Sequence, residues 1–492
     1  MEIFDPNDTI CAISTPPGCG GIAVARISGK DALAITDKIW KGKPLSAAQT
    51  HTAHLGEIID YDGSALDQGV ATVFRGPRSY TGDDTVEISV HGSRWIQRRL
   101  IGLLVGNGAR IALPGEFTRR AFTSGRLDLA EAEAVADLIA SSSKAAHRIA
   151  MRQMKGAVSQ RLSELREQLL DLTSLLELEL DFSEEEVEFA SREKLLEIAS
   201  KIRAEISRLH RSFNSGSAIK EGIPVAIVGE TNAGKSSLLN ALLGDNKAIV
   251  SDVHGTTRDI IEDTIEIDEY LFRFMDTAGL RQTCDVVENI GIGRSREAAT
   301  KASAIIIVVD SGADIRAQIS NIMPYLSETY TTTPLIVALN KTDLLPPSAS
   351  TSAGLKNGNN VTPSLRGEFD GLAASRILAE ISGFKSVETV NISAKTGDGL
   401  DELQAELVGI ARHLADSDGE NDILITNARH AEALQNALVS IDRVIAALGA
   451  QLSGELVAQD LRETLSHLSS ITGQITPTDT LTNIFANFCI GK

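Results

Sequence analysis

The stretch PVAIVGETNAGKSSLLNALLG, residues 224–244, decides the fold of the central part of the chain. It begins with an apolar run typical of a strand buried on both faces and ends with a segment at helical spacing. Between them, Gly229 to Ser236 match the pattern GxxxxGK[ST] of a P-loop. Glycines let such a loop turn its backbone N–H groups toward an anion at a helix N-terminus. The strand before it and the helix after it make a chance glycine turn a poor alternative.

Two motifs further along the chain indicate which nucleotide the loop would bind. Residues 340–343, Asn-Lys-Thr-Asp, follow the apolar run PLIVAL and match the NKxD pattern. The Asp343 carboxylate can accept hydrogen bonds from N1–H and the exocyclic amine of guanine, which adenine does not offer. Residues 393–395, Ser-Ala-Lys, resemble the companion loop whose backbone contacts the guanine oxygen. Alone, the tetrapeptide also suits a turn after a strand, but its order with the other two motifs favours a guanine site.

Two segments between these motifs have the positions of nucleotide-sensing switches. Asp276-Thr-Ala-Gly279 follows the run LFRFM, and we expect Asp276 to hold Mg²⁺ through water and the Gly279 N–H to sense the γ-phosphate. GTTRD, residues 255–259, lies where switch I belongs and offers Thr257 as a second Mg²⁺ ligand beside Ser236. Leu280 stands where Ras-like proteins place a water-orienting glutamine, so another group must position the water or hydrolysis must be slow.

The sequence therefore predicts a site for GTP and Mg²⁺ in which Lys235 neutralises the β- and γ-phosphates. We expect the following residues to contact GTP: Asn232, Ala233, Gly234, Lys235, Ser236, Ser237, Ser251, Asp252, Val253, His254, Gly255, Thr256, Thr257, Asp276, Thr277, Ala278, Gly279, Asn340, Lys341, Thr342, Asp343, Ser393, Ala394 and Lys395.

The periodicity of apolar residues predicts a multidomain α+β and α/β protein. We place an α+β domain at 1–122, a first helical part at 123–219, an inserted Ras-like P-loop G domain at 220–411 and a second helical part at 412–492. Each helical flank has an apolar stripe but no core of its own, so we expect the two flanks to pack into one helical domain. Two connections are expected on the surface: the acidic stretch 181–188 and the Ser/Gly-rich insertion 346–372.

Composition restricts the setting of these domains. The chain of 492 residues is 42% hydrophobic and 23% charged, which is ordinary for a globular protein. No apolar run suits a membrane span, the start MEIFDPND does not resemble a signal peptide, and four cysteines are too few for a disulfide scaffold, so we expect a cytoplasmic protein. The net charge of -19 gives no support for autonomous nucleic-acid binding. The chain could still contact RNA through a local basic patch or with the help of a basic partner protein.

The whole chain resembles the MnmE (TrmE) family of GTPases that help to modify the wobble uridine of certain tRNAs. The resemblance rests on TPPGCGGIAVARISG, PGEFTRRAF and LDLAEAEAVADLI in the N-terminal part, on the P-loop, GTTRD and DTAGLR segments, and on the terminal motif FCIGK, residues 488–492. The terminal motif is the most specific single mark of the family.

This resemblance implies that the N-terminal domain binds a tetrahydrofolate, 5,10-methylene- or 5-formyl-, and takes part in dimerisation. The folate contacts would be Arg26, Glu87, Arg126 and Lys492, with lysine at the third position in some relatives. Without the resemblance, Arg26 and Glu87 would be interpreted as a surface ion pair. Cys489 would then be a free thiol beside a one-carbon donor, with burial as an inert residue as the alternative.

The resemblance also implies a potassium ion held against the phosphates. Its ligands would come from Asn232, Ser251, Val253 and Thr256, and Glu288 would orient the attacking water. The catalytic set is then Glu288, Lys235, Thr256 and Thr257. Thr231 departs from the proline that many relatives have.

As partners, the resemblance implies a second copy of the chain, the FAD-binding protein MnmG in a heterotetramer or larger assembly, and tRNA, with no membrane. Together they would add a carboxymethylaminomethyl-type group to C5 of the wobble uridine. Two alternatives remain from the residues alone: a regulatory GTPase in ribosome assembly, and a folate-dependent aminomethyltransferase acting on small molecules.

Overall fold

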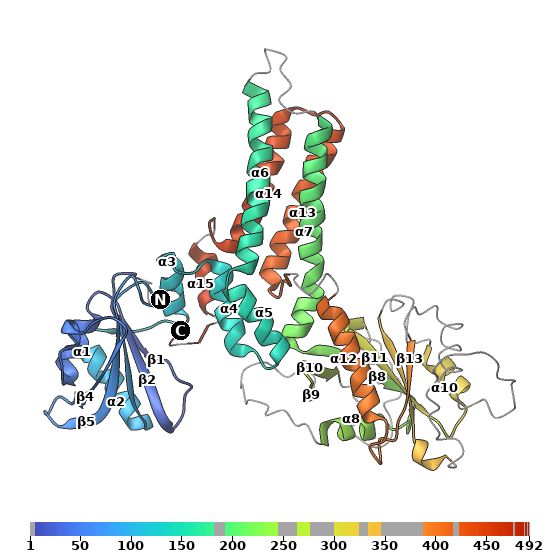
Figure 1. The fold of residues 1–492 in the computed structure, drawn as a ribbon, viewed down its shortest axis with the longest axis horizontal. Helices are drawn as coiled ribbons and strands as arrows, with labels where there is room; N and C mark the ends of the chain where they lie inside the picture. Colours follow the sequence, from blue (N-terminus) through green and yellow to red (C-terminus); the bar gives the residue numbers. More distant parts are fainter. Residues whose placement is uncertain are drawn as a thin grey trace. The chain divides into compact units, whose positions relative to one another are not determined.

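The computed structural model describes residues 5–181, 192–244, 263–275, 300–323, 333–345, 387–416, 423–475, 478–486, 488, 489 and 491 (Figure 1). The chain divides into two compact units. The first unit comprises Met1–Ala140, Ala150–Ile206 and Glu432–Lys492, and the second comprises Ser141–Ile149 and Ser207–Ala431. The chain passes between the units at four points: once directly after Ala140, and once within each of the helices α5 (Lys144–Met154), α7 (Arg192–Glu221) and α13 (Ala428–Gly449).

The first unit begins with a sheet of order β3-β4-β5-β6-β2-β1-β7, antiparallel except for the last pair. Its strands are β1 (Ile10–Ile13), β2 (Gly20–Ser28), β3 (Trp40–Lys41), β4 (Thr52–Ile59), β5 (Ala65–Phe74), β6 (Thr85–Gly92) and β7 (Arg110–Ile111), and its helices are α1 (Ala32–Ile39), the 3-10 helix η1 (Leu45–Ala47), α2 (Arg94–Gly106) and α3 (Glu116–Thr123). Period-two alternation along β5 and β6 sends every second side chain into a core that α1 and α2 complete on one face of the sheet (Figure 1).

The remaining helices of the first unit come from both ends of the chain. They are α4 (Leu129–Ala140), α6 (Ala157–Asp181), α14 (Gly454–Thr472) and α15 (Thr478–Ala486), together with parts of α7 and α13. Helix α6 packs along α14, and α4 contacts both. Leu162, Leu169 and Leu172 of α6 are at most 3% exposed, as are Leu461 and Leu468 of α14. The apolar stripes on the two flanks of the chain therefore pack in one unit.

The second unit contains a six-stranded sheet of order β13-β12-β11-β8-β10-β9. Its elements are β8 (Ile223–Gly229), α8 (Lys235–Gly244), β9 (Asp263–Ile267), β10 (Tyr270–Met275), β11 (Ala304–Asp310), α10 (Ile315–Ile322), β12 (Leu335–Asn340), the 3-10 helix η5 (Thr342–Leu344), β13 (Val387–Asn391) and α12 (Leu400–Asp416). All neighbouring strands are parallel except β9 and β10.

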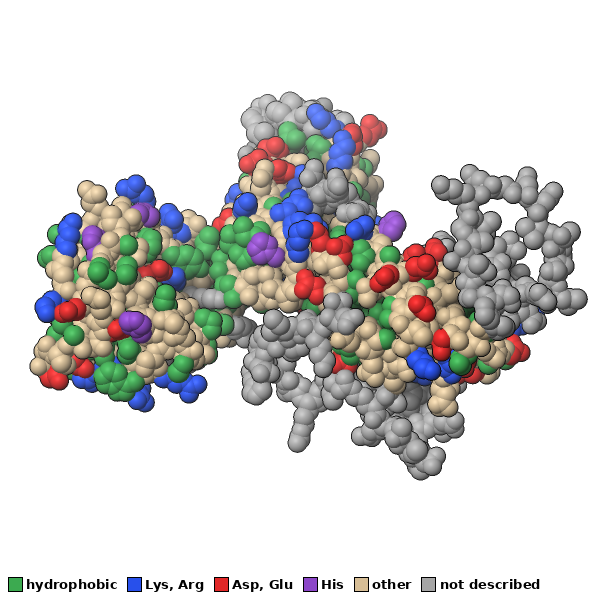
Figure 2. Space-filling model, turned by 60° about the horizontal axis from the view of Figure 1, so that its bottom comes forward, with side chains coloured by type: hydrophobic (Ala, Val, Ile, Leu, Met, Phe, Trp, Pro, Cys, Tyr) green, Lys and Arg blue, Asp and Glu red, His purple; other side chains and the backbone are tan. Residues whose placement is uncertain are grey.

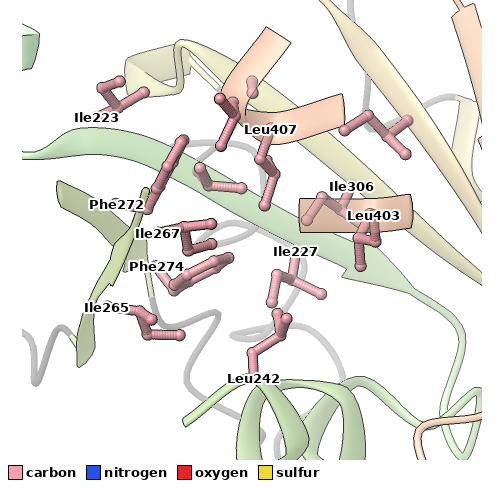
Figure 3. Packing of buried hydrophobic residues seen from close by; sticks show 14 of the residues in the cluster. Ile223, Ile227, Leu242, Ile265, Ile267, Phe272, Phe274, Ile306, Leu403 and Leu407 are labelled. Atoms are coloured by element: carbon pink, nitrogen blue, oxygen red, sulfur yellow. The ribbon is translucent and has the colours of Figure 1, made fainter. Parts of the chain in front are cut away.

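The central strands of this sheet are apolar throughout because both of their faces are buried. Alternate residues of β11 belong to two separate cores: Ile306 lies in one, and Ile305 and Ile307 lie in the other. Helices α8 and α12 cover the first face, where Leu242 and Leu407 meet the sheet (Figure 3), and α10 covers the second.

The predicted fold class, α+β and α/β elements in one multidomain chain, is confirmed by these two sheets and the helices around them. The sequence analysis did not identify β9, the antiparallel edge strand. The predicted boundaries after residues 122, 219 and 411 stay predictions, and the insertion 346–372 lies outside the described residues. Within the described part of the chain, no helix has the length and apolar character needed to span a membrane.

Candidate nucleotide-binding site

The P-loop, the NKxD segment and the SAK segment lie at the same edge of the second sheet. They follow β8, β12 and β13, which run parallel with β11 between the first two. Carboxyl ends of parallel strands point to one edge, and ligands bind there at the point where the strand order reverses. Strand β8 is that point, because the chain continues to β9 and β10 on one side and to β11 on the other. The topology thus places the three predicted motifs together.

The P-loop turns sharply between β8 and α8. Asn232 has φ 65° and Gly234 has φ 101°, and the Ala233 N–H donates to the Glu230 carbonyl at 3.3 Å. A side chain at Gly234 would collide with the Asn340 amide, so the glycine is required both for its conformation and for this close approach. Helix α8 begins directly afterwards at Lys235, so the N–H groups of its first turn lie at the loop.

Lys235 lies inside this loop. Its Nζ donates to the carbonyls of Gly229 and Glu230, both at 2.8 Å. Burial lowers the pKa of Lys235, while the nearby Glu230 carboxylate opposes that change. Phosphate oxygens would favour the charged ammonium in the same way and more strongly. The geometry therefore suits a lysine that binds phosphate.

Asn340 joins the phosphate end of the site to the base end. Its Nδ2 donates to the Ala233 carbonyl at 2.9 Å, and its Oδ1 accepts from the Ala394 N–H at 2.9 Å. The side chain is buried, and both its donor and its acceptor side are used. One side chain thus fixes the P-loop against the SAK loop.

The Asp343 carboxylate and the SAK loop are held side by side. Ser393 donates from Oγ to Oδ1 of Asp343 at 2.8 Å, and the Thr396 N–H donates to Ser393 Oγ at 3.2 Å. Thr342 is fixed by two hydrogen bonds, from N–H and Oγ1, to the Ile392 carbonyl at 3.3 and 3.0 Å. Among the described residues, only Oδ1 of Asp343 accepts a hydrogen bond, so its Oδ2 can accept one from a base.

The sequence analysis missed Asp310, the residue that orients Lys341. Lys341 has φ 65°, and its Nζ forms an ion pair with Oδ2 of Asp310 at 2.6 Å. Burial raises the pKa of Asp310, but the hydrogen bonds from Lys341 and the Gly312 N–H outweigh it and leave the pKa below its usual value. An aspartate that ends an apolar strand beside the P-loop strand is the sequence signal that could have found it.

Several predicted contacts cannot be placed. Residues 251–257, the DTAG segment 276–279 and Glu288 lie outside the described residues. Ser236 and Ser237 are described, at the first turn of α8.

The first unit holds a second cluster of predicted residues. Arg26 and Glu87 are direct cross-strand partners on β2 and β6, and Arg26 Nη2 lies 2.7 Å from Glu87 Oε1. The Arg26 guanidinium lies over the rings of Tyr80 and Phe117, 5.4 and 5.5 Å from their centroids. Both charged side chains are 20–28% exposed, so the pair is accessible to a ligand.

Arg126 and the C-terminal tail lie in the same unit. Arg126 is exposed, with its Cγ beside Gly82 in the loop that also carries Tyr80. The Gly115 N–H donates to the Cys489 carbonyl at 3.3 Å, and Ser14 Oγ donates to the Gly491 carbonyl at 3.0 Å. Cys489 is exposed, which excludes its burial as an inert residue, and Lys492 lies outside the described residues. By contrast, burial raises the pKa of the Cys11 thiol to about 12.

The strand order, the P-loop and the converging loops define a Ras-like P-loop G domain inserted in a longer chain. Family models match on both sides of it: the GTP-binding protein TrmE N-terminus at residues 9–126 and the MnmE helical domain at 129–489. The chain belongs to the MnmE (TrmE) family, which confirms the resemblance inferred from the motifs.

Curated relatives match along their full length. The tRNA modification GTPase MnmE of Parabacteroides distasonis is 47% identical over 98% of this chain and 100% of its own. The protein of the same name from Cytophaga hutchinsonii is 44% identical over 100% of this chain and 99% of its own. Among solved structures, a GTP-binding protein from Sulfolobus solfataricus in complex with GDP is 20% identical over 51% of this chain and 67% of its own, with a TM-score of 0.27.

Replacing the base-facing carboxylate tests the predicted nucleotide preference. Asp343→Asn exchanges an acceptor for a donor, which mismatches the guanine amine and suits the carbonyl of xanthine. We expect GTP binding to weaken by about 2–4 kcal/mol and XTP binding to appear, as measured by calorimetry on the full chain. Unchanged GTP affinity in this variant would remove Asp343 from the site, and Asp401→Asn, on the exposed first turn of α12, is the matched control.

Proposed function

We propose that this chain hydrolyses GTP and, with the FAD-dependent protein MnmG, adds a carboxymethylaminomethyl-type group to C5 of the wobble uridine of certain tRNAs. A folate one-carbon unit supplies the carbon. The observation that carries the proposal is the buried amide of Asn340, which joins the P-loop to the guanine-recognition loops in a chain whose relatives are named tRNA modification GTPases over their full length.

In this proposal Lys235 binds the β- and γ-phosphates, and the Ser236 and Thr257 hydroxyls hold Mg²⁺. Mg²⁺ neutralises charge that develops on the phosphate oxygens. Gly234 lets the loop backbone approach the phosphates, and Asn340 keeps it in that shape. Glu288 orients the attacking water in place of the glutamine that Leu280 replaces.

A potassium ion fits the P-loop because of Asn232. This residue is exposed, has the left-handed conformation that Asn tolerates, and makes no side-chain hydrogen bond to any described residue. Its carbonyl oxygen is therefore available as a ligand next to Lys235. Ser251, Val253 and Thr256 would complete the oxygen shell. Positive charge there replaces an arginine finger, which is worth about 10³–10⁵ in rate where one exists.

A tetrahydrofolate fits the cluster around Arg26 on two grounds. The Arg26–Glu87 pair offers donors and an acceptor on a partly exposed sheet face, and the rings of Tyr80 and Phe117 hold the guanidinium in place. Arg126 and Lys492 would bind its carboxylates. The C-terminal tail is fixed at Gly115 and Ser14, which places the Cys489 thiol in the same domain as this pair.

The proposed assembly contains two copies of the chain bound to MnmG, in a heterotetramer or larger complex that acts on tRNA in the cytoplasm. The chain itself would contribute the GTPase cycle and the folate site. A regulatory GTPase in ribosome assembly would not be needed to form the modified nucleoside. A folate-dependent aminomethyltransferase acting on small molecules would not need tRNA as its substrate.

Loss of the modified nucleoside is the direct test. Deleting the gene should remove the carboxymethylaminomethyl-type uridine from bulk tRNA, as measured by mass spectrometry of nucleosides, and re-expression of the wild-type chain should restore it. A Lys235→Ala chain should fail to restore it. Unchanged tRNA nucleosides with a defect in ribosomal subunits would support the ribosome-assembly alternative instead.

The potassium site predicts a salt-specific GTPase. Hydrolysis should be faster in potassium chloride than in matched sodium chloride, and Asn232→Ala should abolish the difference while GDP binding stays nearly intact. Asn232→Gly is the matched variant: it removes the same side-chain oxygen but does not strain the left-handed backbone, so it separates loss of the oxygen from backbone strain. Glu288→Ala should keep G-domain dimerisation in GDP and aluminium fluoride, measured by sedimentation, but slow the chemistry. Equal rates in both salts would refute this site.

The folate site predicts a role for the terminal tail. Removing the last four residues deletes Cys489, whose carbonyl binds Gly115, together with Gly491 and Lys492. We expect calorimetry to show weaker binding of 5-formyltetrahydrofolate and unchanged GTP affinity. Full-strength folate binding by the truncated chain would exclude the tail from the site.

A further inference from the structure

Helix α2 has an exposed face that the fold does not explain. Its buried side, Leu100, Leu103 and Leu104, completes the core of the sheet domain. Its opposite side begins with Arg94, Trp95 and Arg98, which are exposed, and the Trp95 side chain is 56% exposed. In a chain with 66 acidic residues, no Asp or Glu occurs between Glu87 and Glu116. The face is therefore locally basic in an acidic protein.

Three features of this face destabilise the free protein. Arg94 and Arg98 are a like-charge pair at i,i+4 spacing, and Arg94, the first residue of the helix, lies at the positive end of the helix dipole. An exposed tryptophan also leaves a large apolar surface in water. Among the described residues, neither Arg94 nor Arg98 has an ion-pair or hydrogen-bond partner.

The neighbouring Arg99, unlike Arg94 and Arg98, has partners among the described residues of the fold. Arg99 forms a bidentate ion pair with Asp60 and lies over the ring of Tyr61, 5.3 Å from its centroid. Asp67, a carboxylate near the start of the helix, is already bound by the N–H and the ring of His91. These two carboxylates are thus engaged by Arg99 and His91, and Arg94 and Arg98 have no counter-charge among the described residues. Figure 2 shows Lys and Arg side chains around the rim of this sheet domain.

We propose that Arg94, Trp95 and Arg98 form a docking surface for an unpaired segment of RNA. The two guanidinium groups would bind consecutive phosphates, and the indole would stack on a base between them. A polyanion relieves the like-charge pair and the unfavourable dipole contact, and a base covers the indole, so one ligand offsets all three costs. An acidic protein segment would leave the indole without a planar partner. This inference rests on the proposed tRNA substrate and names where the chain itself contacts it.

Binding at this surface can be followed by tryptophan fluorescence. The chain contains two tryptophans, and Trp40 is only 8% exposed. Base stacking should therefore quench Trp95 fluorescence when a single-stranded RNA of about ten nucleotides is added to the full chain. Trp95→Phe should remove the quenching yet keep most of the affinity measured by anisotropy of labelled RNA. Trp95→Ala should weaken binding about 5- to 100-fold.

The arginines have a separate signature in salt. The logarithm of RNA affinity should fall with the logarithm of salt concentration, and replacing Arg94 and Arg98 by alanine should make this fall less steep, by about 0.7 in the slope for each residue. Arg78→Ala is the matched control, because Arg78 is an exposed arginine of the same domain that lies outside α2. GTP hydrolysis without RNA should be unchanged in all these variants.

Two results would show that RNA does not bind at this surface, without assigning the surface to another partner, and both leave the proposed function standing. One is wild-type RNA affinity in the Arg94/Arg98 and Trp95→Ala variants. The other is an absence of RNA binding by the wild-type chain while gene deletion still removes the modified nucleoside. Quenching by polyglutamate or by anionic phosphatidylglycerol vesicles, with none by RNA, would assign the face to a different partner and also refute the proposal.

Discussion

The side-chain amide of Asn340 is the interaction on which the nucleotide site depends. It is buried and bridges the Ala233 carbonyl of the P-loop to the Ala394 N–H of the SAK loop. Leaving a buried backbone donor or acceptor without a partner costs about 1–3 kcal/mol, so both loops favour the arrangement in which the amide lies between them. The loops predicted to bind the phosphates and the base are thereby held at a fixed separation, and next to Asn340 the Lys341 ammonium forms an ion pair with Asp310.

The parallel sheet makes this bridge possible because it brings three strand ends to one edge. The apolar strands that do so require cover on both faces, which α8 and α12 supply on one side and α10 on the other. The second unit therefore closes its own core. The leucine stripe of α6 has no such cover nearby in sequence and instead packs against α14, close to the other end of the chain. Insertion of a self-contained sheet between two incomplete helical flanks satisfies both requirements.

Local patterns predicted much of this arrangement. The P-loop, the apolar strands and the helical stripes depend on residues that are close in sequence, so periodicity and spacing reveal them. Contacts between distant segments were not accessible in the same way. The Asp310–Lys341 ion pair depends on two adjacent strands ending level. The sequence analysis named an Arg26–Glu87 ion pair only as the alternative to a folate contact, because the direct facing of the two residues depends on the register of β2 against β6. The edge strand β9 is short and partly polar, which gives its segment little signal of either kind.

In the sheet domain, the buried carboxylate of Glu116 joins separate segments of the chain, as the Asn340 amide does in the nucleotide site. Glu116 is 1% exposed and binds Arg110 through both oxygens, Arg120 through one, and the Leu113 N–H. Burial raises its pKa, but these hydrogen bonds and charges outweigh burial and leave the pKa lowered, so the carboxylate stays ionised at neutral pH. Removing one partner of such a buried pair typically costs about 3–5 kcal/mol.

The same carboxylate fixes the start of α3, and two contacts follow from that. Phe117 is placed under the Arg26 guanidinium, and Gly115, at φ 64°, presents its N–H to the Cys489 carbonyl. A side chain at Gly115 would meet the Phe485 carbonyl at 2.7 Å, so the tail approaches only because this residue is glycine. The position of the exposed Cys489 thiol therefore depends on a charge cluster far from it in sequence, rather than on the terminal motif alone.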